Sequence, residues 1–367
     1  MSLKELVSGP TGMLRLSAAL SVLFALVYWF NVRGNKNGKT ARRTAAPDPL
    51  SSDWTEIGRV TELYYYPLKS GRGKPISQCD FTDFGISFAE DGLFTLKDRM
   101  FLVYSEKSGE FQTGRSFPNL VLLNIYSVDE WSVGLEANGM PSLVFRVPET
   151  AIRRPSDEVD CSMWWGERLK CIDCGPAPAA WISKFLTGRE DSDLRLGSAL
   201  PVRRNILKGP WEKFTKVYTT LGNEDTGYFS DITSYMLMTE ASLGELNKRL
   251  DRTVKSLQLR PNIVISGCEP FAEDSWEWIK IGDSVVLRNV KPCPRCSMIR
   301  IDPETAEVNP LEPLKTLRSF REQKDPKRAD LDGKAPTLGI YCGLYRAGSV
   351  KITDRVFVLP FASHVNT

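Results

Sequence analysis

Short apolar runs rich in β-branched and aromatic residues recur along the chain from Trp54 onward, and turn-forming residues separate them. VTELYYYPL, RMFLVYS and NLVLLNIYSV are examples with the length and composition of β-strands. Ser108 with Gly109, and Gly282 with Asp283, each stand between two such runs and predict hairpin turns. The pattern predicts a strand-rich α+β body of β-barrel type rather than a doubly wound parallel sheet.

Three segments have helical patterns instead: residues 177–186, 242–250 and 313–320. In residues 242–250 (SLGELNKRL) the leucines recur at spacings of three and four, which is typical of an amphipathic helix. Ser242 followed three positions later by Glu245 predicts a capping box at the start of this helix.

Near the N-terminus, residues 16–32 (LSAALSVLFALVYWFNV) contain no charged side chain. Together with residues 13–15 the segment is long enough to cross a bilayer, which takes about 20 residues. A cleaved signal peptide, a buried core helix and a signal anchor are the competing interpretations. YWFNV is a poor cleavage site, and a core helix would not explain the basic cluster that follows. We therefore predict a transmembrane signal anchor at residues 13–32.

The positive charge of the chain is concentrated beside this segment. Residues 1–45 carry a net charge of +6 in a chain of net charge +3, so the remainder carries −3. A body without excess positive charge argues against nucleic-acid binding. Since five Lys and Arg residues follow the span within eleven positions, the positive-inside rule places the C-terminal body in the cytosol.

The chain contains a single histidine, His364, which is the fourth residue from the C-terminal end of the sequence. Catalytic arrangements that need imidazole, and haem, zinc or non-haem iron sites that rely on it, are disfavoured. The sequence also lacks the glycine patterns of dinucleotide and P-loop sites. A metal in this protein is therefore expected to take sulfur or oxygen ligands.

The sequence contains two pairs of cysteines with the spacing C-x-x-C: Cys171 with Cys174, and Cys293 with Cys296. The gap between the pairs is far longer than that of a zinc ribbon, which argues against a four-cysteine zinc site. Cys171 lies in a strand-like run and Cys174 before a helix, so packed thiols are favoured there over a thioredoxin-type pair.

The second pair has different neighbours. Pro292 and Pro294 stiffen its turn, and Lys291 and Arg295 bring positive charge close to the sulfurs. Positive neighbours lower the pKa of a thiol and favour the thiolate that binds metals. Spacing alone leaves a functional site and a structural loop with inert thiols equally open.

NVKPCPRC, with RPNIVISG before it and EPLKTLRSFR after it, resembles the MOSC domains of the mitochondrial amidoxime-reducing components. VTELYYYPLKS and LKDRMFLV resemble the first strand and the arginine-bearing strand of the MOSC N-terminal barrel. FSDITSYMLMTEASLGELNKRL, AEDSWEWIKIGD and GKAPTLG continue the pattern, which runs in order from Val60 to Leu359. The resemblance implies a MOSC β-barrel core preceded by a MOSC N-terminal β-barrel-like domain.

We accordingly expect six regions along the chain. They are a tail at residues 1–12, the anchor at 13–32, a basic proline-containing linker at 33–53, the MOSC N-terminal domain at 54–200, the MOSC domain at 201–361 and a tail at 362–367.

The resemblance implies a pyranopterin-dithiolene molybdenum cofactor (molybdenum-molybdopterin) whose metal takes one thiolate from the protein. In the family pattern this is the second cysteine of the pair, so Cys296 is the expected metal ligand and catalytic residue. Cys293 is then expected near the metal without binding it. Soft thiolate ligation suits such a centre.

Further cofactor contacts follow from the resemblance, and the chemistry of each residue is compatible with them. Lys69 and Ser70, expected at the end of a strand, offer a charge and a hydroxyl to an anion. Arg99 and Arg260 can make forked hydrogen bonds to phosphate or pterin, and Asn262 is expected on the same strand face as Arg260. The other expected contacts are Asp231, Thr233, Ser234, Arg295 and Gly339.

The resemblance further implies reduction of N-hydroxylated substrates, namely amidoximes, hydroxylamines and N-oxides. The chain shows no flavin, nicotinamide or iron–sulfur motif of its own, so electrons are expected from an external donor. The resemblance implies cytochrome b5 and NADH-cytochrome b5 reductase as that donor system. A non-catalytic carrier of the molybdenum cofactor and a persulfide sulfur carrier are the alternatives. The family favours the mitochondrial outer membrane over the endoplasmic reticulum.

Overall fold

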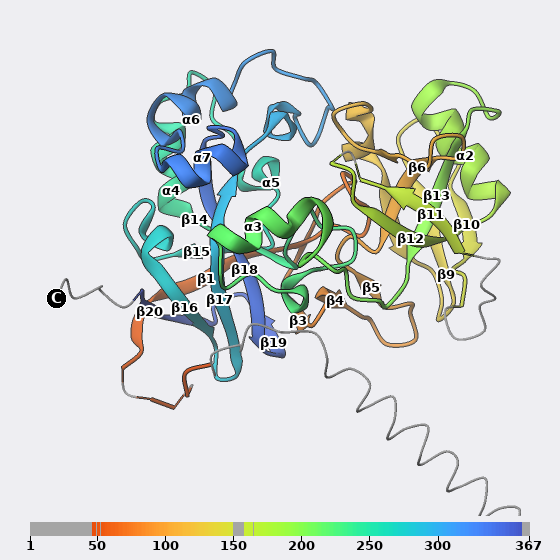
Figure 1. Ribbon diagram of the computed structural model, residues 1–367. Coiled ribbons are helices and arrows are strands. Elements are labelled where there is room, and N and C mark those ends of the chain that lie inside the picture. The colour runs from red at the N-terminus through yellow and green to blue at the C-terminus, as the bar shows by residue number, and fades with distance from the viewer. Residues whose placement is uncertain (1–45, 49, 52, 150–157, 164, 362–367) are drawn as a thin grey trace, which may run out of the picture. The chain divides into compact units, whose positions relative to one another are not determined.

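The computed structural model describes residues 46–361 except 49, 52, 150–157 and 164 (Figure 1). The anchor expected at residues 13–32 and most of the expected linker lie outside the described residues. Within the described part of the chain, no helix combines the length and hydrophobicity needed for a membrane span.

Seven strands form a closed barrel, in the order β15-β14-β18-β17-β16-β20-β1, with β1 pairing back onto β15. Their bounds are β15 Ile263–Ser266, β14 Tyr235–Thr239, β18 Thr337–Arg346, β17 Val285–Pro294, β16 Trp276–Ile281, β20 Arg355–Pro360 and β1 Thr55–Tyr65. Neighbours are antiparallel except β14 and β15, which run parallel. Closure pairs the backbone groups that an open sheet would leave at its edges. A short strand, β2 (Lys74–Ile76), extends from β1.

Three smaller sheets complete the strand-rich fold that the sequence predicts. The first has the strand order β11 (Glu158–Ser162), β12 (Arg168–Asp173), β13 (Leu194–Ala199), β6 (Phe101–Ser105) and β7 (Phe111–Gln112). The second has the order β19 (Gly348–Lys351), β3 (Gln78–Thr82), β4 (Gly85–Phe88) and β5 (Leu96–Lys97). The third has the order β10 (Leu143–Arg146), β9 (Ser132–Glu136) and β8 (Asn124–Ser127). The hairpin turns predicted at Ser108 with Gly109 and at Gly282 with Asp283 are confirmed, because they join β6 to β7 and β16 to β17.

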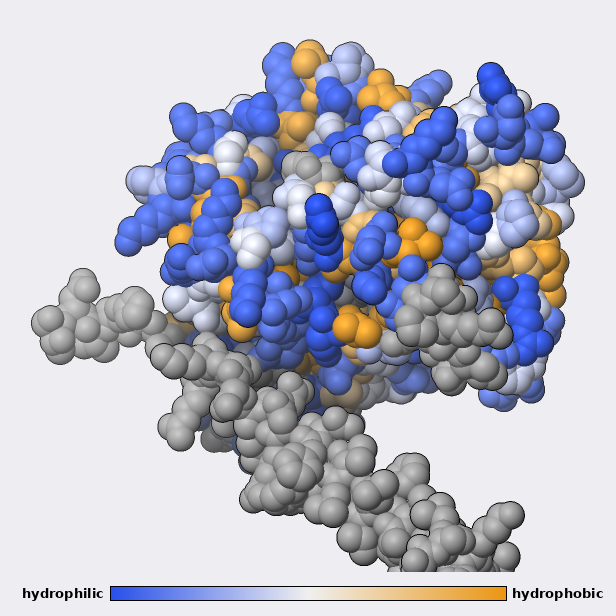
Figure 2. Space-filling model, turned by 45° about the vertical axis from the view of Figure 1, so that its right-hand side comes forward, coloured by the Kyte–Doolittle hydropathy of each residue, from blue (hydrophilic) through white to orange (hydrophobic). Residues whose placement is uncertain are grey.

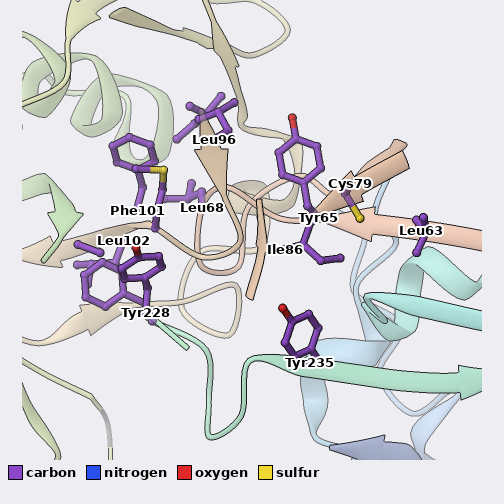
Figure 3. Close-up of a cluster of buried hydrophobic side chains, with 14 of the residues drawn as sticks. Leu63, Tyr65, Leu68, Cys79, Ile86, Leu96, Phe101, Leu102, Tyr228 and Tyr235 are labelled. Atoms are coloured by element: carbon purple, nitrogen blue, oxygen red, sulfur yellow. The ribbon is translucent and has the colours of Figure 1, made fainter. Parts of the chain in front are cut away.

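The two halves of the sequence exchange strands. β1 comes from the beginning of the described chain but closes the barrel of later strands, and β19 comes from its end but pairs with β3. This exchange explains why a single apolar core continues from the barrel into the smaller sheets. Leu63 and Tyr65 of β1, Ile86 of β4 and Tyr235 of β14 pack in it, as Figure 3 shows.

Helices are short and flank the sheets, with α2 beside β13 and β10, and α4, α6 and α7 gathered at one end of the barrel (Figure 1). The α-helices are α2 (Pro176–Thr187), α3 (Glu212–Val217), α4 (Glu240–Asn247), α5 (Ser256–Leu259), α6 (Leu314–Arg321) and α7 (Pro326–Asp332). The 3-10 helices are η2 (Pro118–Leu122), η4 (Gly209–Trp211), η5 (Asn223–Asp225), η6 (Ala272–Ser275) and η7 (Ser297–Arg300).

The predicted capping box at Ser242 is wrong. α4 begins at Glu240, and its N-cap is Thr239, whose hydroxyl accepts a hydrogen bond from the backbone N–H of Ser242. Ser242 instead donates to the buried carboxylate of Glu273. The S-x-x-E pattern misplaced the start because Thr239, at the end of β14, already satisfies the first turn of the helix.

The face of the molecule in Figure 2 is mostly hydrophilic, with apolar residues scattered over it. Among the described residues, the large apolar side chains with the greatest exposure are Leu50, Val128, Trp131, Val144, Val202, Val308, Leu311 and Phe361. Isolated exposed apolar residues of this kind are ordinary for a folded protein.

Candidate functional site

Cys296 lies at the end of β17, where the strand stops and η7 begins, and its side chain is exposed. It lines an open pocket of about 120 Å³ together with Cys293, Arg260 and Lys69. The pocket is walled by residues from the beginning and the middle of the chain, which the exchange of strands brings together. An accessible thiol in a pocket is the first requirement of a cysteine that binds a ligand.

The turn that carries Cys296 is held by Arg295. The Arg295 guanidinium is buried and donates to Leu338 O through Nε (2.8 Å) and Nη2 (2.6 Å), and to Leu259 O through Nη1 (2.6 Å). The backbone N–H of Arg295 donates to Pro336 O at 2.8 Å. The Arg295 guanidinium thus donates hydrogen bonds to backbone carbonyls of two other segments, and these contacts fix the position of Cys296.

Cys293 has different surroundings from Cys296, although both line the pocket. Its thiol is 2% exposed and lies beside Tyr341. Burial raises the pKa of Cys293, although the charges of Arg295 and Lys291 act in the opposite direction. The predicted lowering of the thiol pKa by these neighbours is therefore wrong for Cys293, because loss of hydration outweighs the nearby charges.

On the opposite wall, Lys69 is 6% exposed and reaches across to the segment before β14. Its ammonium group donates to Phe229 O at 2.8 Å and to Asp231 Oδ1 at 2.7 Å. Burial lowers the pKa of Lys69. Partial loss of water would raise the pKa of Asp231, but the Lys69 ammonium lowers it to about 2, so this carboxylate is ionised at neutral pH.

A second buried cation holds the same segment. Arg204, which is 4% exposed, donates to Ser230 O at 2.6 Å and to Asp231 O at 3.0 Å. It also makes a bidentate ion pair with Glu167, at 2.9 and 2.6 Å. Lys69 and Arg204 together therefore bind the carbonyls of three consecutive residues of the pocket wall.

Arg99 and Arg260 also line the pocket. Arg99 pairs with Asp98 and donates to Asn262 Oδ1 at 3.3 Å. Arg260 donates through Nη1 to Gly71 O at 2.8 Å, whereas its Nη2 is buried and has no hydrogen-bond partner among the described residues. The hydroxyl of Ser230, another lining residue, is likewise buried without a partner there.

Asn262 is 1% exposed and serves mainly to hold its neighbours. Its Oδ1 accepts from the backbone N–H of Met236 at 3.2 Å, and its Nδ2 donates to Tyr64 O at 3.2 Å. The expected common strand face of Arg260 and Asn262 is wrong, because Arg260 ends helix α5 and Asn262 precedes β15. Both still reach the pocket, through a turn rather than through strand alternation.

Three site residues share an unusual backbone conformation. Ser70, Arg99 and Arg260 have φ values of 62°, 50° and 57°, in the left-handed region that residues with a Cβ rarely adopt. Lys69 and Ser70 lie in a turn after β1 rather than at the end of the strand. Such strain is concentrated at functional sites, where the surrounding structure maintains it.

Most of the expected site residues line the pocket, but two do not. Lys69, Ser70, Arg99, Asp231, Thr233, Arg260, Asn262, Arg295 and Cys296 are lining residues. Ser234 is 3% exposed and its hydroxyl donates to Asp225 O at 3.2 Å. Gly339 has φ 74°, and a Cβ there would lie 2.5 Å from Leu237 O. Its conformation therefore serves the close approach of β18 to β14.

Sequence reasoning missed several lining residues, among them Thr113, Arg115, Ser230, Met236 and Tyr341. Strand alternation offered one signal, because Tyr341 lies two positions after Gly339 on β18. Thr113 and Arg115 follow β7, in a turn that no spacing rule connects with Cys296.

A larger hollow, of about 490 Å³, lies among residues 249–258 and 300–316. Its charged side chains form solvent-exposed pairs, such as Lys255 with Glu304 and Arg252 with Asp302. Without a thiol or a deeply buried charge in its lining, this hollow is a weaker candidate than the pocket at Cys296.

Cys171 and Cys174 lie in the main apolar core, at 0% and 8% exposure. Cys171 lies within β12, and its thiol is beside that of Cys161. In the described part of the chain, no three His, Cys, Asp or Glu side chains are grouped so that they could hold a metal ion.

Comparison with known domain families gives two matches. Residues 57–189 match the MOSC N-terminal beta barrel domain, and residues 225–357 match the MOSC domain.

Curated proteins of similar sequence include the human mitochondrial amidoxime-reducing component 1, which is 34% identical over 88% of this chain and 89% of its own length. The human mitochondrial amidoxime reducing component 2 is 32% identical over 82% of this chain and 84% of its own length. The zebrafish (Danio rerio) component 1 is 34% identical over 84% of this chain and 86% of its own length.

Proposed function

Because the chain belongs to the family of the mitochondrial amidoxime-reducing components, we propose that it is a molybdenum-cofactor-dependent oxidoreductase that reduces N-hydroxylated compounds. The observation that carries the proposal is the exposed thiol of Cys296 in a pocket lined by Arg260, whose Nη2 has no hydrogen-bond partner among residues 46–361 as far as they are described. A soft thiolate and a free cationic donor are what a metal with an anionic organic ligand requires.

The residues of the pocket fit such a cofactor. Buried polar atoms in folded proteins normally have partners, so Arg260 Nη2 and Ser230 Oγ are donors reserved for a group that enters the pocket. The pocket volume of about 120 Å³ is below the roughly 300–1,000 Å³ of typical ligand sites. Binding of a pyranopterin therefore requires that side chains at the open mouth move apart.

In this proposal Cys296 provides the protein thiolate to molybdenum, and Cys293 stays beside the site as a buried thiol. Ser70, Ser230 and Arg260 bind the cofactor phosphate through hydroxyl and guanidinium donors. Asp231, 56% exposed and ionised, accepts hydrogen bonds from pterin N–H groups. Thr233, buried at the wall, donates its hydroxyl to Tyr235 O at 3.0 Å and shapes the pocket.

Three other residues act by holding this arrangement. Arg295 fixes the turn of Cys296, Lys69 fixes Asp231, and Asn262 ties Arg99 to β14. These contacts are made within the protein itself, so the side chains that position Cys296 and Asp231 are already held and lose little conformational entropy when the cofactor binds.

The bound cofactor would supply the two-electron redox chemistry that the protein side chains cannot perform. Reduction of an amidoxime to an amidine breaks the N–O bond, consumes two electrons and two protons, and releases the oxygen as water. The electrons come from outside the chain, and we propose cytochrome b5 with NADH-cytochrome b5 reductase as their source.

The relatives are named as mitochondrial components, which supports a mitochondrial location for this chain. We propose attachment to the outer membrane through residues 13–32, with the body facing the cytosol. A shared membrane would raise the encounter frequency with an anchored electron donor.

The test is amidoxime reduction by the full chain, purified in detergent from a host that makes the cofactor. We expect NADH-dependent formation of benzamidine from benzamidoxime when cytochrome b5 and its reductase are added, and molybdenum in proportion to protein. Cys296→Ala should lose both. A wild-type protein without molybdenum, or a fully active Cys296→Ala protein, would contradict the proposal.

Two outcomes of this test favour the alternatives. Stoichiometric molybdenum without turnover of any N-hydroxylated substrate would indicate a cofactor carrier. A mass increase of one sulfur atom on Cys293 or Cys296, in protein free of molybdenum, would indicate a persulfide carrier.

A further inference from the structure

Tyr66 follows β1 directly and is completely buried beneath the pocket. Two guanidinium groups stack on its ring, with the Cζ of Arg99 and of Arg260 at 4.2 and 4.3 Å from the ring centroid. The phenol hydroxyl donates to Pro261 O at 3.0 Å, and the backbone N–H of Tyr66 donates to Asp98 Oδ1 at 2.9 Å. Tyr66 is therefore held through its hydroxyl and through its backbone, and the two partners, Pro261 and Asp98, belong to the turns that carry Arg260 and Arg99.

The two arginines come from segments distant in sequence. Arg99 lies between β5 and β6, and Arg260 ends α5, so each leaves its own turn with a positive φ. Both guanidinium groups nevertheless contact the same aromatic ring, that of Tyr66. A guanidinium group is attracted to an aromatic ring by the negative electrostatic potential of the ring face.

The charges around the ring are not balanced. Arg99 has the carboxylate of Asp98 as its partner, whereas no carboxylate lies within ion-pair distance of Arg260 in the described part of the chain. The ring of Tyr66 is thus the main electrostatic partner of Arg260 within the protein. Nη1 of Arg260 is anchored to Gly71 O, and Nη2, which has no partner, is left for a ligand.

We propose that Tyr66 is a positioning residue for the anion that binds in this pocket: its ring holds the Arg99 and Arg260 guanidinium groups in place and aligns Nη2 of Arg260 for a phosphate oxygen. The inference rests on the proposed function, because the phosphate is that of the cofactor. Neither the C-x-x-C pair nor any spacing around Arg260 indicates this role, which belongs to a side chain that does not line the pocket.

The proposal separates two effects of the ring, its shape and its electrostatic potential. Fluorine atoms on an aromatic ring weaken its attraction for cations stepwise and change its size very little. A residue that only fills space would tolerate them, whereas a residue that holds cations through its π face would not.

The experiment uses the full chain with Tyr66→Phe and with mono-, di- and trifluorinated phenylalanine incorporated at position 66. The dissociation constant of inorganic phosphate is measured by calorimetry on cofactor-free protein, and the half-life of bound molybdenum on dialysis is measured on loaded protein. We expect phosphate affinity and molybdenum retention to fall with each fluorine, by about tenfold over the series. Tyr66→Phe itself should stay within about threefold of wild type, because it keeps the ring.

Phe101 provides the matched control. It is 0% exposed, lies close in the chain to Arg99, and no guanidinium stacks on its ring in the described structure. The same fluorinated series at position 101 should leave phosphate affinity unchanged. If the Tyr66→Phe protein does not fold, 3-fluorotyrosine at position 66 retains the hydroxyl contact to Pro261 O, and phosphate affinity is compared with wild type at mildly acidic pH, where this phenol stays protonated. An unchanged affinity would then overturn the role of the ring.

The outcomes distinguish this inference from the function on which it rests. A wild-type protein that holds molybdenum and binds phosphate, with a fluorine series at position 66 as flat as that at position 101, would overturn the role of Tyr66 alone. A wild-type protein that holds neither molybdenum nor phosphate would overturn the proposed function itself.

Discussion

The two C-x-x-C pairs of this chain occupy the same topological position but have opposite surroundings. In both pairs the first cysteine lies near the end of a strand, β12 or β17, and the second immediately precedes a helix, or the residue that caps it. Cys171 and Cys174 are enclosed by the main apolar core, at 0% and 8% exposure. Cys296 is exposed in a pocket lined by Lys69, Arg260 and Asp231, and Cys293 lies buried beside it.

The comparison shows that spacing and local secondary structure do not decide what a cysteine pair does. Burial in apolar surroundings raises the pKa of Cys174 well above its usual value and leaves that thiol inert. Around Cys296 the fold has gathered cations from three separate turns, at a cost in backbone strain and buried charge. That cost is expected at a binding site and would be unexplained in a purely structural loop.

The largest difference between the pairs should appear in activity. Cys296→Ser should be purified with little molybdenum, because the cofactor is held without its protein thiolate, and amidoxime reduction should fall by more than about 100-fold, the upper range for loss of a mere supporting contact. Cys174→Ser should retain molybdenum and activity within about twofold, because its thiol faces the apolar core. Metal analysis and steady-state turnover of the two variants measure these effects. Equal losses of molybdenum and activity in both variants would contradict the difference in role between the two cysteine pairs.

The next largest effect concerns the buried charges that support the pocket. Arg204→Met leaves the carboxylate of Glu167 buried without its cation and frees the carbonyls of Ser230 and Asp231. We expect the free energy of unfolding to fall by about 3–5 kcal/mol. Arg189→Met is the control, because its pair with Asp191 is 73% exposed on both sides and water screens the interaction, so the free energy of unfolding should stay close to that of wild type. Urea unfolding measures both; similar values would contradict the role given to Arg204.

The effects on stability should rank the two cysteine pairs in the opposite order from the effects on activity, with the larger loss of stability in the buried pair. Cys171→Ser places a hydroxyl in the apolar core and should destabilise the protein by about 1–3 kcal/mol. Cys296→Ser, at an exposed position, should change the free energy of unfolding of cofactor-free protein by less than about 0.5 kcal/mol. Chemical denaturation gives both numbers, and a larger loss in Cys296→Ser than in Cys171→Ser would refute the assignment.

The smallest effect is a dependence on pH that only the pocket should show. The Lys69 ammonium lowers the pKa of Asp231 from 3.8 to about 2, against the effect of burial, so the ion pair stabilises the folded state above pH 3.8. This contribution is lost as pH falls through about 2. Asp231→Asn should therefore be less stable than wild type by about 0–1 kcal/mol at neutral pH, since the carboxylate is half-exposed.

The test is the difference in unfolding free energy between wild type and Asp231→Asn as a function of pH. The difference should be constant from pH 8 to about 5 and shrink below pH 4. The corresponding difference for Cys171→Ser should not vary with pH, because this side chain lies in the apolar core. A difference for Asp231→Asn that grows on acidification would reverse the sign we assign.

Much of the fold and part of the site follow from sequence pattern. Alternating apolar runs indicated the strands, and the turns at Gly109 and Gly282 were correctly placed because they need glycine at positive φ. The barrel was predicted, but the pairing that closes it was not, since β1 and β15 belong to segments about two hundred positions apart. The capping box failed at Ser242 because the competing cap, Thr239, belongs to the preceding strand.

The site residues were limited in the same way. Lys69, Arg99, Arg260 and Cys296 were expected from the family resemblance, and all four line the pocket. Arg204, Glu167 and Tyr66 were not expected, because each acts on a pocket residue through contacts that no sequence spacing encodes. Residues that support a site from behind are visible only when the chain is folded.

The most direct measurement is X-ray absorption spectroscopy at the molybdenum edge, on wild-type protein and on Cys296→Ser loaded with cofactor at high concentration. The dithiolene supplies two sulfur atoms, so the account predicts about three sulfur neighbours in wild type and about two in Cys296→Ser. Cys293→Ser should keep about three. A third sulfur that persists in Cys296→Ser, or disappears in Cys293→Ser, would contradict the assignment of Cys296 as the metal ligand.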